Sequence, residues 1–555
     1  MRKILFASSL SIGSLLIGLS VFAEQIGLDN NSSWGAGRYL MLEAGIALLT
    51  ISILGMAFRN KFAVLGQRIS EALNKFKKIK YSTRMVIFSL PVMLIVMAIY
   101  IWFALPNFEA SKFNYYSLQA IAFKKHQLYL VQEPSPALLA LDDPYNYVLR
   151  KSKGVEDFPW DASLYNKKFY LYWGPVPALP LIFFSAETLN HIGDEYLVLA
   201  FMCGLFFYCV LFSYLIWLRF NQTLPPWLFG VSVLVIGLSA PATWMLNASR
   251  IYEAAIIGSQ FFFIGGCYWA YTSLKDKSPS LPKLALSGLH WALALGTRFT
   301  ILPVIFFAVG MTLLYVFKQI KPISIKSFFT ALACLCAPLV LAAIGLGWYN
   351  WARFNSVFEF GLTYQLATVN YTTFHTPFST YYINDNVYNY FIHALKFQRQ
   401  FPYIQPIENT FSNERLAGLL YISPYILFAG LFIGRGIRQA NLPNEEDGGT
   451  LGNWLMLTLA GSSLISILTI LSYYFPATRF GEDFMPSLLL LATASLGQGY
   501  RFLGRNTITR KAYIIFVVLV ALFSVIASSL VAFPPQKAKY IFAFFKGIYG
   551  FLGFR

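Results

Sequence analysis

The chain has 555 residues, of which 57% are hydrophobic and 12% are charged. A soluble domain typically carries about twice that charged fraction, so the composition excludes a string of soluble domains and predicts a multi-pass membrane protein. The net charge is +18, which the basic cytoplasmic loops of a membrane protein explain without a nucleic-acid partner.

Long apolar segments follow one another along the chain. A helix that crosses a bilayer needs about 20 mostly apolar residues. Segments of this kind lie at 4–23, 39–58, 86–105, 196–218, 225–247, 252–273, 281–297, 301–317, 327–350, 415–434, 451–474, 482–499 and 512–533. The sequence therefore predicts an all-α integral membrane protein of about thirteen transmembrane helices.

The two ends of the chain differ from its middle. Residues 4–23 follow Arg2 and Lys3, and we interpret them as a retained anchor rather than a cleaved signal peptide. We predict an N-terminal two-helix extension with a basic cytoplasmic loop at 1–85, a transmembrane core at 86–534 and a basic amphipathic tail at 535–555.

Basic loops orient the predicted helices. The loop at 59–84 holds eight Lys and Arg residues and one acid, so it is expected in the cytoplasm together with the basic turns at 318–326 and 500–511. These three basic segments all lie on the cytoplasmic side only if the stretch 173–190, which contains several prolines, does not cross the membrane. We therefore expect a re-entrant or interfacial segment there.

Two long extracytoplasmic loops follow from this topology, at about 106–195 and 352–414. Both are rich in aromatic residues and are too long to be simple connections, so we expect them to carry the function.

Arginines gather near the outer ends of the predicted helices, where positive charge is not expected: Arg250, Arg298, Arg353 and Arg479. A guanidinium donates several hydrogen bonds to phosphate oxygens, so a lipid phosphate would explain them together. The alternative is that they are interfacial residues or pair with Glu253, Glu359, Glu482 or Asp483.

Three acids of the first loop are candidates for a general base: Glu109, Asp143 and Asp161. A carboxylate beside an aromatic surface at membrane level can acquire a raised pKa and accept a proton. Asp161 precedes the run that contains Tyr172 and Trp173, which are candidates for substrate binding or for ordinary interfacial packing. The alternatives for the acids are a turn at Asp143-Pro144 and a helix cap at Asp161.

Other chemistries have no pattern in the sequence. The five cysteines lie in apolar stretches and the five histidines are scattered, so neither a metal site nor a cofactor is predicted. Motifs of nucleotide-binding loops are absent, which argues against an ATP-driven pump. Whether a divalent cation assists is left open.

An ordered set of motifs resembles the GT-C superfamily of polytopic glycosyltransferases. The resemblance is to a bacterial branch related to protein mannosyltransferases and to lipid A aminoarabinose transferases, and it covers residues from about 86 to 500. The motifs are Phe113-Asn114-Tyr115-Tyr116, Lys125-His126-Gln127-Leu128-Tyr129-Leu130, Asp143-Pro144-Tyr145, Trp160-Asp161-Ala162-Ser163-Leu164-Tyr165-Asn166, Tyr170-Leu171-Tyr172-Trp173-Gly174-Pro175, Arg250-Ile251-Tyr252-Glu253-Ala254, Gly296-Thr297-Arg298, Tyr349-Asn350-Trp351-Ala352-Arg353-Phe354-Asn355-Ser356 and Arg479-Phe480-Gly481-Glu482-Asp483-Phe484.

The resemblance implies transfer of a sugar from a polyprenyl-phosphate donor to an extracytoplasmic acceptor, which is a lipid, a polysaccharide or a protein. It implies a multi-pass protein of the plasma (inner) membrane, in contact with membrane lipids. A carboxylate of the first outer loop would deprotonate the acceptor, and Glu109, Asp143 and Asp161 are the candidates. Phosphate and substrate would be held by Arg250, Arg298, Arg479, Tyr172 and Trp173.

One departure from the superfamily pattern keeps alternatives open. The superfamily usually has an acid a few residues before the tyrosine that corresponds to Tyr115, whereas here the nearest upstream acid is Glu109. Either Glu109 reaches the site, or Asp143 or Asp161 replaces it, or the protein is an inactive scaffold of envelope assembly. A transporter or flippase for a lipid-linked saccharide is a further alternative, although the predicted helix centres are almost free of the ionisable residues that it would need.

Overall fold

The computed structural model describes residues 2–28, 34–57, 76, 78–104, 114–276, 278–319, 324–432, 448–504 and 506–534. The described chain is mostly helical and includes six helices that are long and apolar enough to cross a membrane. This agrees with the prediction of a helical membrane protein, whereas the predicted number of about thirteen transmembrane helices stays a prediction. The predicted tail at 535–555, most of the basic loop at 59–84 and Glu109 lie outside the described residues.

The chain forms two compact units, Met1–Arg84 and Met85–Arg555. In the first unit, α1 (Arg2–Val21) packs against α2 (Ala36–Ala57). Glycines allow the two helices to approach closely, since a Cβ atom on Gly45 would lie 2.9 Å from the carbonyl oxygen of Gly13.

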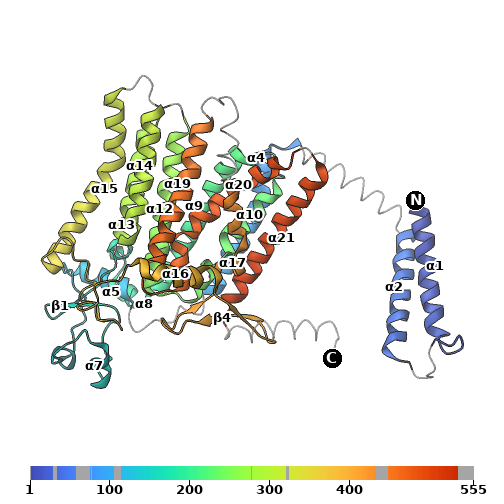
Figure 1. The fold of residues 1–555 in the computed structure, drawn as a ribbon, viewed down its shortest axis with the longest axis horizontal. Coiled ribbons are helices and arrows are strands. Elements are labelled where there is room, and N and C mark those ends of the chain that lie inside the picture. The colour runs from blue at the N-terminus through green and yellow to red at the C-terminus, as the bar shows by residue number, and fades with distance from the viewer. Residues whose placement is uncertain are drawn as a thin grey trace. The chain divides into compact units, whose positions relative to one another are not determined.

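The second unit is a bundle of long helices that lie side by side (Figure 1). These helices are α4 (Tyr81–Ala104), α9 (Asp194–Phe220), α10 (Trp227–Leu238), α12 (Ile251–Leu274), α13 (Leu281–Thr297), α14 (Leu302–Gln319), α15 (Ile325–Phe354), α19 (Gly448–Leu471), α20 (Met485–Phe502) and α21 (Thr507–Val531). Helix α12 packs against both α9 and α13 and is buried along most of its length. Its N-terminus is therefore held firmly at one end of the bundle. The described parts of the loops at 106–195 and 352–414, named the first and second outer segments, lie at the same end.

Two predicted helices are interrupted in the structure. Segment 225–247 is divided into α10 and the short helix α11 (Ala242–Asn247), and Pro241 lies at the break. Segment 415–434 contains the two-residue strand β5 (Arg415–Leu416), the short helix α17 (Leu419–Ile422) and the 3-10 helix η6 (Pro424–Phe432). Proline cannot donate the backbone hydrogen bond that a continuous helix needs, and its ring disturbs the preceding turn.

The first outer segment folds into short elements at one end of the bundle (Figure 1). Its helices are α5 (Tyr115–Lys124), α6 (Pro136–Leu139), α7 (Tyr147–Ser152), the 3-10 helix η2 (Val176–Phe183) and α8 (Ala186–His191). Strands β1 (Ser163–Tyr165) and β2 (Lys168–Tyr170) form an antiparallel hairpin in which Leu164 pairs with Phe169. The proline-rich stretch 173–190 thus holds only short helices.

The second outer segment carries a three-stranded antiparallel sheet. Its strands are β3 (Leu395–Phe397), β4 (Ile404–Glu408) and β5 (Arg415–Leu416), with β4 in the centre. Short helical turns precede it: η4 (Thr380–Tyr382), α16 (Ile383–Val387) and the π-helix η5 (Tyr388–Ile392). After α19 the chain returns through the 3-10 helix η7 (Thr478–Asp483).

Backbone hydrogen bonds join the two outer segments. The Leu164 N–H donates to the Tyr364 carbonyl (2.9 Å), and the Leu366 N–H donates to the Ala162 carbonyl (2.9 Å). The edge of β1 opposite β2 is therefore also paired. The two segments form one layer over the ends of the helices.

Close packing of α13 on α15 provides a test of the fold. A Cβ atom on Gly288 would clash with the backbone carbonyl of Leu335, whereas a Cβ atom on Gly310 of α14 would meet nothing within 4 Å. We expect Gly288→Ala to lower the free energy of unfolding by about 1–3 kcal/mol, because overpacking forces the helices apart. Gly310→Ala is the matched control. Thermal unfolding of the purified protein in detergent measures both, and equal melting temperatures for the two variants would contradict the observed packing.

Candidate functional site

A cavity of about 910 Å³ lies between the outer segments and the helix ends. Its walls come from the first outer segment, from the N-terminus of α12, from α13, α15 and α19, and from η7. Six residues predicted for the site line it together: Asp161, Tyr172, Trp173, Arg250, Arg298 and Arg479. Asp143 is not among the described residues that line this cavity.

Asp161 occupies a rigid position directly before the β-hairpin. Its backbone has a positive φ of 62°, a conformation that Asp adopts more readily than most residues. Its N–H donates to the carbonyl of Leu366 (3.2 Å), and the next residues form β1. The carbonyl of the preceding Trp160 accepts a hydrogen bond from the Tyr115 hydroxyl (2.8 Å). The backbone on both sides of the carboxylate is thus held in place.

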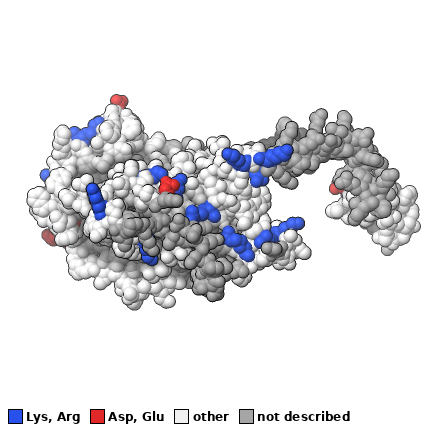
Figure 2. Space-filling view, turned by 90° about the horizontal axis from the view of Figure 1, so that it is seen from above, with Lys and Arg blue, Asp and Glu red and all other residues white. Residues whose placement is uncertain are grey.

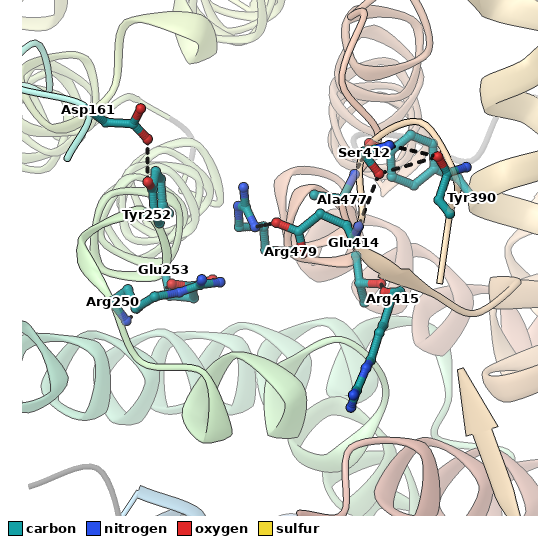
Figure 3. Close-up of polar contacts among 12 residues, drawn as sticks. Asp161, Arg250, Tyr252, Glu253, Tyr390, Ser412, Glu414, Arg415, Ala477 and Arg479 are labelled. Atoms are coloured by element: carbon teal, nitrogen blue, oxygen red, sulfur yellow. Dashed lines mark hydrogen bonds and ion pairs between the residues drawn. The ribbon is translucent and has the colours of Figure 1, made fainter. Parts of the chain in front are cut away.

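The side chain of Tyr252 contacts both Asp161 and Arg479 (Figure 3). Tyr252 lies in the first turn of α12, and its hydroxyl donates a hydrogen bond to Oδ2 of Asp161. The guanidinium carbon of Arg479 lies 4.8 Å from the centre of the Tyr252 ring, within range of a cation–π interaction. One aromatic ring therefore separates a carboxylate from a cation.

Burial raises the pKa of Asp161 to about 6. The hydrogen bond from Tyr252 and the positive charges of Arg479, Arg150 and Arg250 act in the opposite direction and limit the rise. A carboxyl group in this range is ionised near neutral pH and still binds a proton readily. This is the property required of a general base.

Arg479 is buried and forms an ion pair across the cavity wall. Its Nη1 lies 2.6 Å from Oε1 of Glu414, the residue directly before β5. Its Nε is buried and has no hydrogen-bond partner among the described residues. The guanidinium therefore has one donor that the described residues leave unsatisfied.

Arg298 stands at the C-terminal end of α13 and binds Asp483 of η7. Its Nη1 donates to both carboxylate oxygens of Asp483, with 2.6 Å to Oδ2. The sequence analysis gave an ion pair with Asp483 as an alternative to phosphate binding, and the structure contains this pair. Only one nitrogen of Arg298 makes these bonds, and the residue faces the cavity.

The other two arginines differ in exposure. The Arg250 side chain is 52% exposed, and its Nη2 lies 3.3 Å from Oε1 of Glu253. Arg353 is buried, and its Nη1 donates to the carbonyl of Leu171 (2.6 Å) while its Nη2 donates to Asn350 (2.8 Å). Arg353 thus supports the chain next to Tyr172, whereas Arg250 is accessible to a ligand.

Asp143 stabilises a turn, which the sequence analysis gave as the alternative to a role as general base. Its Oδ1 accepts a hydrogen bond from the Tyr145 N–H (3.0 Å), and its Oδ2 accepts one from the side-chain amide of Asn370 (3.0 Å). Both oxygens thus stabilise the loop and its contact with the second outer segment.

Tyr172 and Trp173 form an aromatic wall of the cavity. Their ring centres lie 4.1 Å apart, and Trp173 makes edge-on contacts with Tyr115 (5.9 Å) and Tyr252 (5.5 Å). These contacts link α5, α12 and the loop after β2 around Asp161.

Tyr252 and Glu414 are site residues that the sequence reasoning missed. Tyr252 lies in the motif Arg250-Ile251-Tyr252-Glu253-Ala254, so its position at a helix start beside a candidate arginine was a usable signal. Glu414 lies in a polar turn of the second outer segment, and no local pattern distinguishes it. Among the described residues, no group of three or more His, Cys, Asp or Glu side chains could hold a metal ion.

No protein family, curated protein or solved structure matches this chain. The site is therefore characterised by its own geometry.

The hydrogen bond from Tyr252 to Asp161 is tested by Tyr252→Phe. Because this bond lowers the pKa of Asp161, its loss moves that pKa above about 6. Labelling of the protonated carboxyl by a hydrophobic carbodiimide, followed across pH by peptide mass spectrometry, measures the change. In the wild type, labelling of Asp161 declines as the pH rises through about 6. The decline occurs at higher pH in the variant, and superimposable curves would contradict the role given to Tyr252.

Proposed function

We propose that the protein is a membrane glycosyltransferase of the GT-C type. It transfers a sugar from a polyprenyl-phosphate donor to an extracytoplasmic acceptor. The observation that carries the proposal is the placement of Asp161 and Arg479 on the two sides of Tyr252 in one cavity. This supplies a base for an acceptor hydroxyl and a cation for a departing phosphate at a single site.

The chemical step assigns one role to each group. Asp161 accepts the proton of the acceptor hydroxyl, and the acceptor oxygen forms a bond to the anomeric carbon of the sugar. The bond between that carbon and the phosphate oxygen breaks, and the electron pair leaves with polyprenyl phosphate. Arg479, Arg298 and Arg250 stabilise the negative charge that develops on the phosphate.

Each of the three arginines forms an ion pair with a carboxylate. These pairs keep the guanidinium groups oriented in a partly desolvated site, where an isolated cation would be costly. The unpartnered Nε of Arg479 and the exposed Arg250 supply donors to a phosphate without rupture of every ion pair.

The same proposal includes the orientation in the membrane. We propose about thirteen transmembrane helices in the plasma (inner) membrane, with the loops at 106–195 and 352–414 on the extracytoplasmic side. Figure 2 shows the bundle from the end remote from the outer segments, where Lys and Arg side chains are more prominent than Asp and Glu. A basic face at that end supports its assignment to the cytoplasm.

Replacement of Asp161 tests the catalytic role. We expect Asp161→Asn to reduce sugar transfer by at least about 100-fold, because the amide cannot accept the acceptor proton. The control is Asp142→Asn, an exposed acid of the same loop. A deletion strain is complemented with each variant at equal membrane abundance, and envelope glycolipids, glycans and glycoproteins are compared by mass spectrometry. Loss of a sugar-sized mass on deletion, restored by wild type and Asp142→Asn but not by Asp161→Asn, is the expected result.

Other outcomes are informative for the alternatives. Full restoration by Asp161→Asn would remove Asp161 as the base and return the role to Glu109. An unchanged envelope in the deletion strain would contradict the transferase and favour an inactive scaffold.

The pH dependence of transfer follows from the pKa of Asp161. The base must be ionised, and its pKa is raised to about 6, so the initial rate rises as the pH increases through about 6 and is constant above pH 7 or so. Initial rates in membrane preparations from the complemented strain measure this profile. A rate that falls over the same interval would contradict general-base catalysis by Asp161.

A further inference from the structure

Trp160 places an aromatic ring at the mouth of the cavity, directly before Asp161. It lines the cavity and is 39% exposed. The Phe158 ring lies nearly parallel to it, with 6.0 Å between ring centres, and Tyr147 contacts it edge-on at 5.9 Å. The Trp160 carbonyl is held by Tyr115. The indole is therefore fixed in orientation although a large part of it is open to solvent.

Gln365 adds a polar group to the same wall. It lines the cavity and is buried, and its Oε1 has no hydrogen-bond partner among the described residues. Gln365 lies opposite Ser163 in the pairing of β1 with the second outer segment. Because the Asp161 N–H donates to the Leu366 carbonyl, Asp161 and Gln365 belong to two chain segments that are paired side by side.

We propose that the acceptor is a saccharide, whose ring packs on Trp160 while one of its hydroxyl groups donates to Gln365. This inference rests on the proposed transferase function. A pyranose has a face of C–H groups and a rim of hydroxyl groups, so it needs both an apolar platform and fixed hydrogen-bond acceptors. Trp160 supplies the platform, Gln365 supplies an acceptor and Asp161 takes the proton of the reacting hydroxyl.

The structure disfavours a peptide acceptor. One mode of peptide binding adds an extended peptide to a strand with an unpaired edge. Here β1 is paired with β2 on one edge and with residues 364–366 on the other. The strand next to Asp161 therefore offers no free edge for a polypeptide.

The surroundings of Trp160 are hydrophilic, as a saccharide acceptor requires. Exposed charged residues precede Trp160 in the chain: Lys151, Lys153, Glu156 and Asp157. In Figure 1 the neighbouring α7 projects from the outer layer away from the bundle. A hydrophilic chain approaching from the aqueous side fits this environment.

Linkage analysis of the envelope tests the acceptor class. Material from the wild type and from the deletion strain is separated into polysaccharide, lipid and protein, and each fraction is analysed by permethylation and mass spectrometry. We expect the missing sugar to be one that is bonded to another sugar. A missing sugar bonded to a protein side chain, or to a lipid with no other sugar, would overturn the saccharide acceptor and leave the transferase standing. If no sugar is missing, both the transferase and this inference fail.

Variants of Trp160 test the platform in the same strains. We expect Trp160→Ala to reduce the missing linkage to about a tenth of the wild-type amount, and Trp160→Phe to retain most of it, because the phenyl ring keeps an apolar face. Trp227→Ala is the matched control, since Trp227 is also 39% exposed and does not line the cavity. All variants are compared at equal membrane abundance. A full amount of the linkage with Trp160→Ala would overturn the platform, and so would equal losses with Trp160→Ala and Trp160→Phe.

Discussion

The double pairing of strand β1 is the constraint on which the candidate site depends. One edge of β1 binds β2, and the other binds residues 364–366 of the second outer segment. A strand of three residues with one free edge would be marginal on its own, because few hydrogen bonds would offset the loss of backbone entropy. Pairing on both edges joins two loops that are far apart in the sequence. It also holds Asp161, at positive φ, over the N-terminus of α12.

Charge balance organises the rest of the cavity. Arg479 pairs with Glu414, Arg298 with Asp483 and Arg250 with Glu253, so each cation is compensated close to the helix ends. Partly buried charges need such partners, and the pairs also prevent the long side chains from adopting many orientations. Within the described part of the chain, Asp161 forms no ion pair with an arginine. Its hydrogen bond comes from the neutral Tyr252, and for this reason burial is the dominant influence on its pKa.

The sequence predicted most of the helices and part of the site. The long apolar runs agree with the helices because helix formation in an apolar setting depends mainly on local composition and length. The exceptions lie at Pro241 and Pro424, where a proline interrupts the predicted helix. Both prolines are visible in the sequence. The arginines at the helix ends were also identified from the sequence, because a charged residue at the end of an apolar segment can be recognised from its neighbours in the chain. Asp143 was visible as an acid in a turn, but its bond to Asn370 was not.

The sequence by itself determined that the chain is mostly helical and apolar as a membrane protein is, roughly where its long apolar segments lie, and which charges stand at their ends. Each of these properties depends on neighbouring residues, so it can be read from a short window. Only the tertiary structure decided which acid faces the arginines, which tyrosine binds that acid and which carboxylate pairs with Arg479. Those choices depend on the packing of α12 against its neighbours and on the pairing of β1 with a distant loop. Partners in space are set by the free energy of the whole fold, and no spacing along the chain encodes them.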